Sequence, residues 1–175
     1  MKRLYVTIGI SGTGKSTYLK KHFDERVIVS PDEIRKELLG DVSNQSDQVI
    51  VWATATKRIK DCLEKHGEAV LDATNVNAKY RHGFMTPFRS MKGVETVALV
   101  FTPNVNISKT RVKQDVEKGV DRAKVPVSVI EKQLKDFNNG YQAIFRQFDK
   151  VKIVEEAILL KNLLTEIRNE KQRIG

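Results

Sequence analysis

Eight consecutive residues near the start of the chain have the types and the spacing that bind the phosphates of a nucleotide. They are Gly9-Ile10-Ser11-Gly12-Thr13-Gly14-Lys15-Ser16, which fit the pattern G-x-x-x-x-G-K-[ST] in full. Glycines let the backbone turn its N–H groups toward phosphate oxygens, and a helix that starts at such a loop adds unpaired donors. The motif predicts that Lys15 contacts the β- and γ-phosphates of ATP and that the Ser16 hydroxyl binds Mg²⁺. We expect the nucleotide to contact Gly9, Ser11, Gly12, Thr13, Gly14, Lys15, Ser16 and Thr17.

Asp32 and Arg35 form a second candidate group. They follow the apolar run 27–29 and the dipeptide Ser30-Pro31, in which Ser30 is a good helix N-cap and Pro31 suits the first helical position. We therefore expect the pair in the first turns of a helix, at the carboxyl end of a strand, where open parallel sheets bind their ligands. Position alone leaves two interpretations open: a role toward a ligand, or an acid that only favours the helix dipole beside a solvated arginine.

A third candidate is Asp72, which comes directly after the apolar run 69–71 and before Ala73-Thr74-Asn75. A carboxylate in this place can hold Mg²⁺ through its water shell, as the acid after a hydrophobic strand does in enzymes with this glycine loop. Together with the loop, the acid indicates a metal site made by Ser16 and Asp72.

Short apolar runs alternate with helical patterns along the chain, which predicts an α/β fold with a parallel sheet covered by helices on both faces. Such runs are typical of buried strands. They lie at residues 4–8, 27–29, 69–71, 96–101 and 151–154. Because the glycine loop follows the first run, we expect a P-loop NTPase domain: one domain over residues 1–175, with about five strands and a small lid.

A long helix is predicted at residues 46–66, and Gly67 is expected to end it. Trp52 and Cys62 are expected in the core, because both fall within the apolar periodicity of this helix. The side expected to be buried consists of Val49, Trp52, Ala53, Thr56, Ile59 and Leu63.

Three more helices are predicted at residues 77–90, 106–118 and 127–137. The first of them is basic, and we expect its charged face to be solvated. The residues concerned are Lys79, Arg81 and Arg89. His82 on the same helix is expected at the surface, because no second His or Cys lies at metal-binding spacing.

The basic segment 119–126 connects the last two of these helices and starts with a glycine. Such a segment could close over bound phosphates as a lid, although its spacing alone favours an ordinary charged connection. The final segment, 155–174, has leucines and isoleucines near heptad spacing and is predicted to be a helix. We expect it to pack on its own domain, with a second copy of the chain as the alternative, because it is short for a coiled coil.

The composition points to an anionic partner. Of the 175 residues, 31 are Lys or Arg and 22 are Asp or Glu, so that the formal net charge is +9. This balance suits nucleic acid. Because the lone Cys62 cannot form an internal disulfide and no stretch is apolar for 18 residues, we expect a soluble cytoplasmic protein that does not bind membranes.

Four blocks in this order make the chain resemble the 5′-hydroxyl polynucleotide kinases of bacteriophages and of bacterial RNA repair. The resemblance covers about residues 1–140. The glycine loop is shared by many NTPases, but the combination of blocks is far more specific. The blocks are Thr7 to Thr17, Asp32 with Arg35, Asp72 to Asn75, and Arg122 shortly before Val125-Pro126.

The resemblance implies a phosphotransferase that uses Mg²⁺ and moves the γ-phosphate of ATP to a hydroxyl of a nucleic acid, first of all the 5′-OH end of DNA or RNA. By position, Asp32 matches the general base of the family, and Arg35 matches an arginine that contacts the phosphate near the acceptor end. Lys15 and Ser16 match the phosphate and Mg²⁺ residues, and Asp72 falls where the family has an acid before Thr-Asn. A phage-encoded protein that acts within the host cell fits this resemblance.

Arg122 matches the lid arginine of the family, which stabilises the phosphoryl group during transfer. Two departures matter. The spacing between this arginine and Val125-Pro126 varies among relatives, so Lys124 is an alternative lid cation. The chain also has Ser30-Pro31 where the family often has Arg or Asn before the acid, and it lacks the D-x-D-x-T signature of a phosphatase, so no second activity is expected.

Other functions remain open from the sequence. The same scaffold would serve a kinase that acts on a hydroxymethylated base in DNA, or on a nucleoside or another small molecule. A nucleotide-binding switch without phosphotransfer would leave Asp32 and Arg35 unexplained, and the N-K-x-D tetrapeptide of GTPases is absent. A basic DNA-binding module without chemistry would leave Lys15 unexplained.

Overall fold

A single sheet of five parallel strands forms the centre of the computed structural model, which describes residues 1–42, 44–119 and 125–154. The strand order is β2-β3-β1-β4-β5, so β1 pairs with β3 on one side and with β4 on the other. Each strand overlaps a predicted apolar run, and the predicted α/β fold is confirmed. The strands are β1 (Lys2–Ile8), β2 (Ile28–Val29), β3 (Glu68–Leu71), β4 (Val94–Phe101) and β5 (Lys150–Val154).

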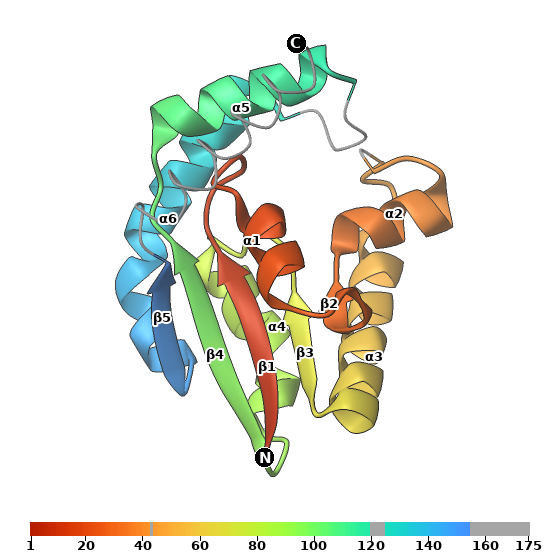
Figure 1. Ribbon diagram of the computed structural model, residues 1–175. Helices are drawn as coiled ribbons and strands as arrows, with labels where there is room; N and C mark the ends of the chain where they lie inside the picture. The colour runs from red at the N-terminus through yellow and green to blue at the C-terminus, as the bar shows by residue number, and fades with distance from the viewer. Residues whose placement is uncertain (43, 120–124, 155–175) are drawn as a thin grey trace.

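Helices cover both faces of this sheet, as predicted. α1 lies on one face, and α3, α4 and α6 lie on the other (Figure 1). α2 and α5 flank the carboxyl ends of the strands from opposite sides (Figure 1). The bounds are α1 (Lys15–His22), α2 (Pro31–Leu39), α3 (Gln48–His66), α4 (Ala78–Arg89), α5 (Val105–Glu117) and α6 (Val127–Gln147), with a short 3-10 helix at Glu25–Val27.

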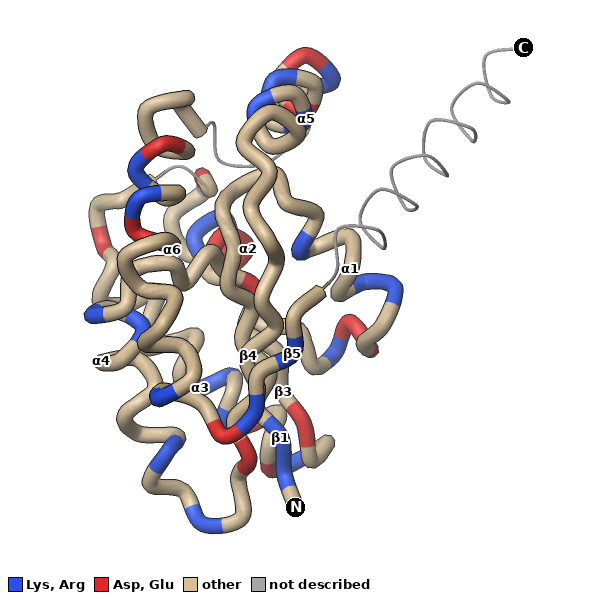
Figure 2. Tube along the Cα trace, turned by 90° about the vertical axis from the view of Figure 1, so that its left-hand side faces the viewer, with Lys and Arg blue, Asp and Glu red and all other residues tan. Residues whose placement is uncertain are grey.

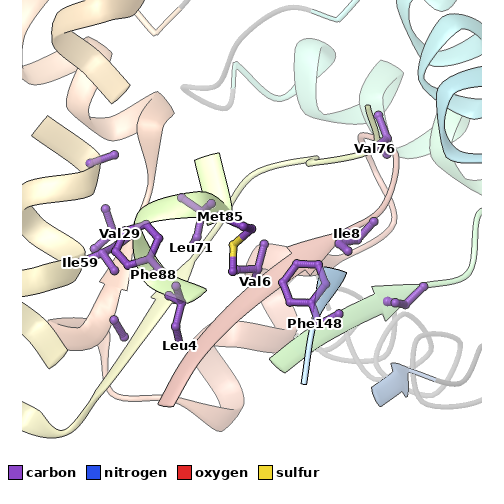
Figure 3. Packing of buried hydrophobic residues seen from close by; sticks show 14 of the residues in the cluster. Leu4, Val6, Ile8, Val29, Ile59, Leu71, Val76, Met85, Phe88 and Phe148 are labelled. Carbon is purple, nitrogen blue, oxygen red and sulfur yellow. The ribbon is translucent and has the colours of Figure 1, made fainter. Parts of the chain in front are cut away.

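The larger part of the core lies between the sheet and α3, α4 and α6. Leu4, Val6 and Ile8 alternate along β1 and point into it, where Met85 and Phe88 of α4 meet them (Figure 3). All five side chains are fully buried. Burial of such a side chain contributes about 1.5–3 kcal/mol, so this layer holds the central strand, and the loop that follows it, in place.

The opposite face of the sheet packs on α1. Val97, Leu99 and Phe101 of β4 form a second cluster with Tyr18 and Leu19 of α1. The rings of Tyr18 and Phe101 meet edge to face, with centroids 5.4 Å apart. Because α1 begins at Lys15, this packing fixes the helix whose start belongs to the glycine loop.

α6 is longer than the sequence predicted: it continues past residue 137 to Gln147. The segment Asn138-Asn139-Gly140 is locally typical of a helix end. Gly140 instead packs so closely that a Cβ atom there would lie 3.0 Å from the carbonyl oxygen of Val76. The prediction was wrong because contact with a distant loop overrides the local preference.

The buried face of α3 also differs from the prediction. The core side is formed by Val51, Ala55, Ile59 and Leu63, all fully buried. Val49 is 82% exposed and Ala53 is exposed, whereas Trp52 and Cys62 are half-buried at the edge of the core. Two overlapping apolar series run along this helix, and the packing on the sheet buries only one of them.

Basic residues are spread over several helices, with acidic ones between them, in the part of the chain that the structure describes (Figure 2). None of the helices among those residues has the length and apolar character of a membrane span. The predicted lid cations Arg122 and Lys124 and the predicted helix at 155–174 lie outside the described residues.

Candidate functional site

The glycine loop joins the carboxyl end of the central strand β1 to the start of α1. Gly12 has φ = 78°, and a Cβ atom there would lie 2.7 Å from the carbonyl oxygen of Ser108 on α5. Gly14 has φ = 87° and directly precedes the first helical residue, Lys15. Only glycine adopts these conformations readily, so the backbone shape and the packing on α5 explain the glycines of the motif.

Lys15 lies against its own loop. The residue is buried, with 8% of its surface exposed, and its Nζ donates a hydrogen bond of 2.7 Å to the carbonyl oxygen of Ile10. Thr13 donates from its hydroxyl to the same oxygen at 2.9 Å. Ser16 and Thr17 are exposed at the start of α1, where the first backbone N–H groups of a helix have no partner within it. The loop, its ammonium group and the helix start form a cradle for anionic oxygens.

Two side chains from distant helices bind the backbone of the loop. Gln133 on α6 accepts a hydrogen bond from the backbone N–H of Ser11, with 2.8 Å between the atoms. Arg111 on α5 donates to the carbonyl oxygen of Gly12 at 3.3 Å. Sequence reasoning missed both residues, because neither lies in a motif and each is about a hundred residues from the loop.

Asp32 and Arg35 lie in the first turns of α2, as predicted. The Ser30 hydroxyl accepts a hydrogen bond of 3.4 Å from the N–H of Glu33, which caps the helix. The guanidinium of Arg35 donates to the carboxylate of Asp32, and its second amino group donates to the side chain of Gln48 at 3.1 Å. The side chain of Arg35 is only 10% exposed, whereas that of Asp32 is 56% exposed. A fixed cation therefore orients a carboxylate that stays open to a ligand.

Asp72 follows the last residue of β3. Its backbone N–H donates to the carbonyl oxygen of Val29 at 2.9 Å, and the pairing of Val6 with Leu71 places it beside the end of β1. Ser16, at the start of α1, and Asp72 thus both lie at the carboxyl edge of the sheet. This donor set fits Mg²⁺, which proteins usually bind through one or two carboxylates, with water and substrate phosphates as the other ligands.

The loop after Asp72 is bonded to the strand that leads into the glycine loop. Asn75, which has φ = 47°, donates from its side chain to the carbonyl oxygen of Thr7 at 2.9 Å. Thr7 donates from its hydroxyl to Ala73, and the N–H of Gly9 donates to the carbonyl of Thr74 at 2.9 Å. These bonds fix the position of the Asp72 loop relative to the glycine loop.

Arg81 holds the same loop from the other side. The prediction that it lies on a solvated face was wrong, since only 2% of the residue is exposed. Its guanidinium donates to the carbonyls of Asn75, Val76 and Gly140 and to the side chain of Gln147, at 2.6, 3.2, 3.0 and 2.6 Å. These acceptors satisfy the buried guanidinium, and burial lowers the pKa of Arg81 to about 10. The arginine ties the Asp72 loop to α6.

The predicted site residues within the described part of the chain thus lie at one edge of the sheet. They come from the ends of two strands and the starts of two helices. The loop follows β1 and leads into α1, Asp72 follows β3, and Asp32 with Arg35 begins α2 (Figure 1). Ligands of open parallel sheets bind at this edge.

A family model described as an AAA domain matches residues 4–139. No curated protein sequence gave a match.

Solved structures with a similar fold include a chain of an RNA repair complex and two small-molecule kinases. A chain of the Pnkp1/Rnl/Hen1 RNA repair complex has a TM-score of 0.69 at 18% identity, covering 81% of this chain and 46% of that one. The chain therefore spans about half the length of this relative. Shikimate kinase from Acinetobacter baumannii has a TM-score of 0.55 at 13% identity, covering 97% and 94% of the two chains. Deoxyadenosine kinase from M. mycoides has a TM-score of 0.51 at 15% identity, covering 98% and 100%. At these identities the similarity concerns the fold, which is that of P-loop kinases.

Proposed function

Because the chain belongs to the AAA domain family that its residues 4–139 match, we propose that it is an ATP-dependent kinase of nucleic acid ends. It transfers the γ-phosphate of ATP to a hydroxyl, and the acceptor that we propose is the 5′-OH end of DNA or RNA. The observation that carries this proposal is the ion pair of Asp32 and Arg35, held at the sheet edge where the glycine loop lies. A protein that only binds nucleotide has no need of an oriented carboxylate there.

In the proposed reaction the oxygen of the acceptor hydroxyl attacks the γ-phosphorus, and Asp32 accepts the proton of that hydroxyl. The bond between the γ-phosphorus and the β–γ bridging oxygen breaks, and ADP leaves. The transition state carries its charge mainly on the equatorial oxygens of the phosphoryl group, so cations around it lower the barrier. Lys15 supplies one cation from the loop and Arg122 supplies another. Ser16 and Asp72 would hold Mg²⁺, which would supply further positive charge to the phosphates.

Arg35 has a second role in this scheme. Its Nη groups hold Asp32 and Gln48, whereas its Nε is buried without a hydrogen-bond partner among the described residues. A buried donor without a partner is costly. We propose that a phosphate of the acceptor strand satisfies the guanidinium when Asp32 turns to the attacking hydroxyl.

Two observations favour a polymer as acceptor. The net charge of +9 attracts polyanions, and the relative with a TM-score of 0.69 belongs to a complex described as an RNA repair complex. The second candidate function is a small-molecule kinase, which the near-complete coverage of shikimate kinase and deoxyadenosine kinase supports. A kinase of hydroxymethylated bases in DNA would use the same residues.

One transfer assay separates these acceptors. The protein is incubated with Mg²⁺ and ATP labelled at the γ-phosphate, and separately with hydroxyl-ended oligonucleotides of DNA and RNA, hydroxymethylated duplex, nucleosides and shikimate. We expect label on the oligonucleotide ends. The Lys15→Ala variant is the negative control, because it removes the ammonium from the phosphate cradle and should abolish transfer while the fold remains.

Label on small molecules alone would replace the polynucleotide function with the second candidate. Transfer by Lys15→Ala at a near-normal rate would contradict the kinase assignment itself.

A further inference from the structure

One face of α3 lies at the surface although much of it is apolar. We call it the α3 face; it consists of Val49, Trp52, Ala53, Thr56, Lys57 and Lys60, which lie on one side of the helix by their spacing. An open surface hollow of about 520 Å³ is lined by all of these residues except Val49. The packing of the core on Val51, Ala55 and Ile59 leaves this side of the helix toward solvent.

The indole of Trp52 is held at the edge of this hollow. Its ring meets Phe84 of α4 at a centroid distance of 5.3 Å and an angle of 63°, and Phe84 packs in turn on Phe88. Trp52 is half-buried and lines the hollow, so part of the residue remains accessible. Tyr80 is 78% exposed and lies one turn before Phe84 on the same side of α4. An aromatic ring that is braced on one side and open on the other is a platform on which a base can stack.

Two lysines line the same hollow. Lys57 and Lys60 are both exposed, and Lys57 forms an ion pair of 2.9 Å with Asp61. Exposed pairs of this kind are weak, so the pair leaves Lys57 able to exchange its partner for a phosphate. Aromatic and basic side chains in alternation are typical of surfaces that bind single-stranded nucleic acid.

The α3 face begins next to Asp32 and Arg35, the residues that we propose bind the end of the acceptor strand. Gln48, which accepts a hydrogen bond from Arg35, is the first residue of α3 and lies one turn before Trp52. Along the helix axis, Gln48 and Lys60 are about 18 Å apart at 1.5 Å per residue. A stacked strand advances about 3.4 Å per nucleotide, so that this distance corresponds to about five nucleotides.

We infer that the α3 face is a binding site for the single-stranded part of the acceptor, several nucleotides from the end that receives the phosphate. A base stacks on Trp52, and Lys57 and Lys60 contact phosphates of the backbone. This inference rests on the proposed kinase function, because it assumes that the strand end lies at Asp32 and Arg35.

The chain has a single tryptophan, which makes its fluorescence a direct probe of this site. The full chain is titrated, in the absence of ATP, with single-stranded oligothymidylates of three nucleotides (dT3) and ten nucleotides (dT10). The fluorescence emission of Trp52 is followed. We expect dT10 to quench the emission with a steep salt dependence, and dT3 to do so only at much higher concentration.

The double variant Lys57→Gln/Lys60→Gln should bind dT10 about 10-fold more weakly. The slope of the logarithm of the binding constant against the logarithm of the salt concentration should be smaller in magnitude by about 1.4, at 0.7 for each of the two lost phosphate contacts. The matched control is Lys20→Gln/Lys92→Gln, which removes the same charge from exposed positions on α1 and just before β4 and should bind nearly as tightly as the unchanged protein.

Transfer assays separate the failure of this site from the failure of the kinase function. With the site in place, the double variant should raise the KM for a ten-nucleotide acceptor about 10-fold and leave the KM for a dinucleotide unchanged. Unchanged emission with dT10, or equal behaviour of the two double variants, would overturn the site even if the protein phosphorylates oligonucleotides. Quenching that depends on Lys57 and Lys60, without transfer to any acceptor, would keep the site and overturn the kinase function.

Discussion

The side-chain oxygen of Gln133 accepts a hydrogen bond of 2.8 Å from the backbone N–H of Ser11, in the middle of the glycine loop. Gln133 lies on α6, and the second half of the same helix binds Arg81 through Gly140 and Gln147. α6 therefore contacts the glycine loop directly and the Asp72 loop through Arg81. Because α6 begins directly after segment 119–126, it also places the end of the segment that carries the proposed lid arginine.

The contact between Gln133 and Ser11 predicts an effect on nucleotide binding. Gln133→Ala removes a hydrogen bond that orders the glycine loop before ATP binds. ATP must then order the loop itself, at a cost of about 1 kcal/mol, so the Kd for ATP should rise about 5-fold. Gln133→Glu keeps an acceptor for the Ser11 N–H but places a negative charge beside the phosphates. Its Kd should rise further, and the difference from Gln133→Ala should shrink at high salt because salt screens exposed charges.

Titration with ATP measures both effects. Asn138→Ala, which removes an exposed amide from the same helix, is the control and should bind ATP normally. If Gln133→Glu binds ATP as tightly as the unchanged protein, the phosphates do not come near this side chain.

Asp32 is predicted to act in the chemical step and not in ATP binding. Asp32→Asn keeps an oxygen that can accept from Arg35 but removes the base, so we expect a Kd for ATP within a few-fold of normal and a kcat lower by about 10²-fold or more. Single-turnover transfer and ATP titration separate the two quantities. Glu33→Gln, the next residue of α2, should leave kcat unchanged. Normal rates for both Asp32→Asn and Asp32→Glu would mean that Asp32 only starts the helix.

Arg122 lies outside the described residues, and its role as the lid cation remains a prediction. The planar guanidinium can make two bonds to phosphate oxygens, which an ammonium cannot reproduce. Arg122→Lys should therefore lose much of kcat although the charge is kept, and Arg122→Ala should lose more, because the contact strengthens as charge develops in the transition state. Lys124→Ala should matter less. The reverse order of the two alanine variants would make Lys124 the lid cation.

A pair of residues far from the site predicts how stability responds to acid. The carboxylate of Asp149 accepts hydrogen bonds of 2.7 Å from both the backbone N–H and the hydroxyl of Thr96, at the start of β4. These bonds, that of the backbone N–H first, lower the pKa of Asp149. A carboxyl whose pKa is lower in the folded state stabilises it above its ordinary pKa of about 3.9, and this contribution is lost as the pH falls through the folded-state value.

Asp149→Asn should therefore lower the free energy of unfolding by about 1 kcal/mol at pH 7, and the difference should shrink as the pH falls below about 3.9 and through the lowered pKa of Asp149. Denaturant unfolding at several pH values measures it. Glu25→Gln, an exposed change on the short 3-10 helix, should have no such effect. A constant difference between Asp149→Asn and the unchanged protein down to pH 2 would contradict the role of the ionised carboxylate.

The sequence by itself determined the features that depend on neighbouring residues. The glycines and Lys15 predicted the loop, because a left-handed backbone and a helix start are decided within a few positions. Ser30 and Pro31 predicted the start of α2 in the same way, and the apolar runs predicted the order of strands and helices. That Asp32, Arg35 and Asp72 lie at one edge of the sheet followed from that order, since parallel strands bring their carboxyl ends together.

The tertiary structure alone decided which side chains are buried and which distant residues touch. Arg81 looked like one more charge on a basic helix, yet carbonyls from two other segments surround it. α3 carries two overlapping series of apolar residues, and only its packing on the sheet decides which series is buried. Val49 and Trp52 are left on the α3 face, where we propose that the acceptor strand binds. Gln133 reaches Ser11 across 122 positions of sequence. Such contacts depend on how whole elements pack. The free energy of burial is summed over many side chains, so no single position in the sequence indicates which contacts will form.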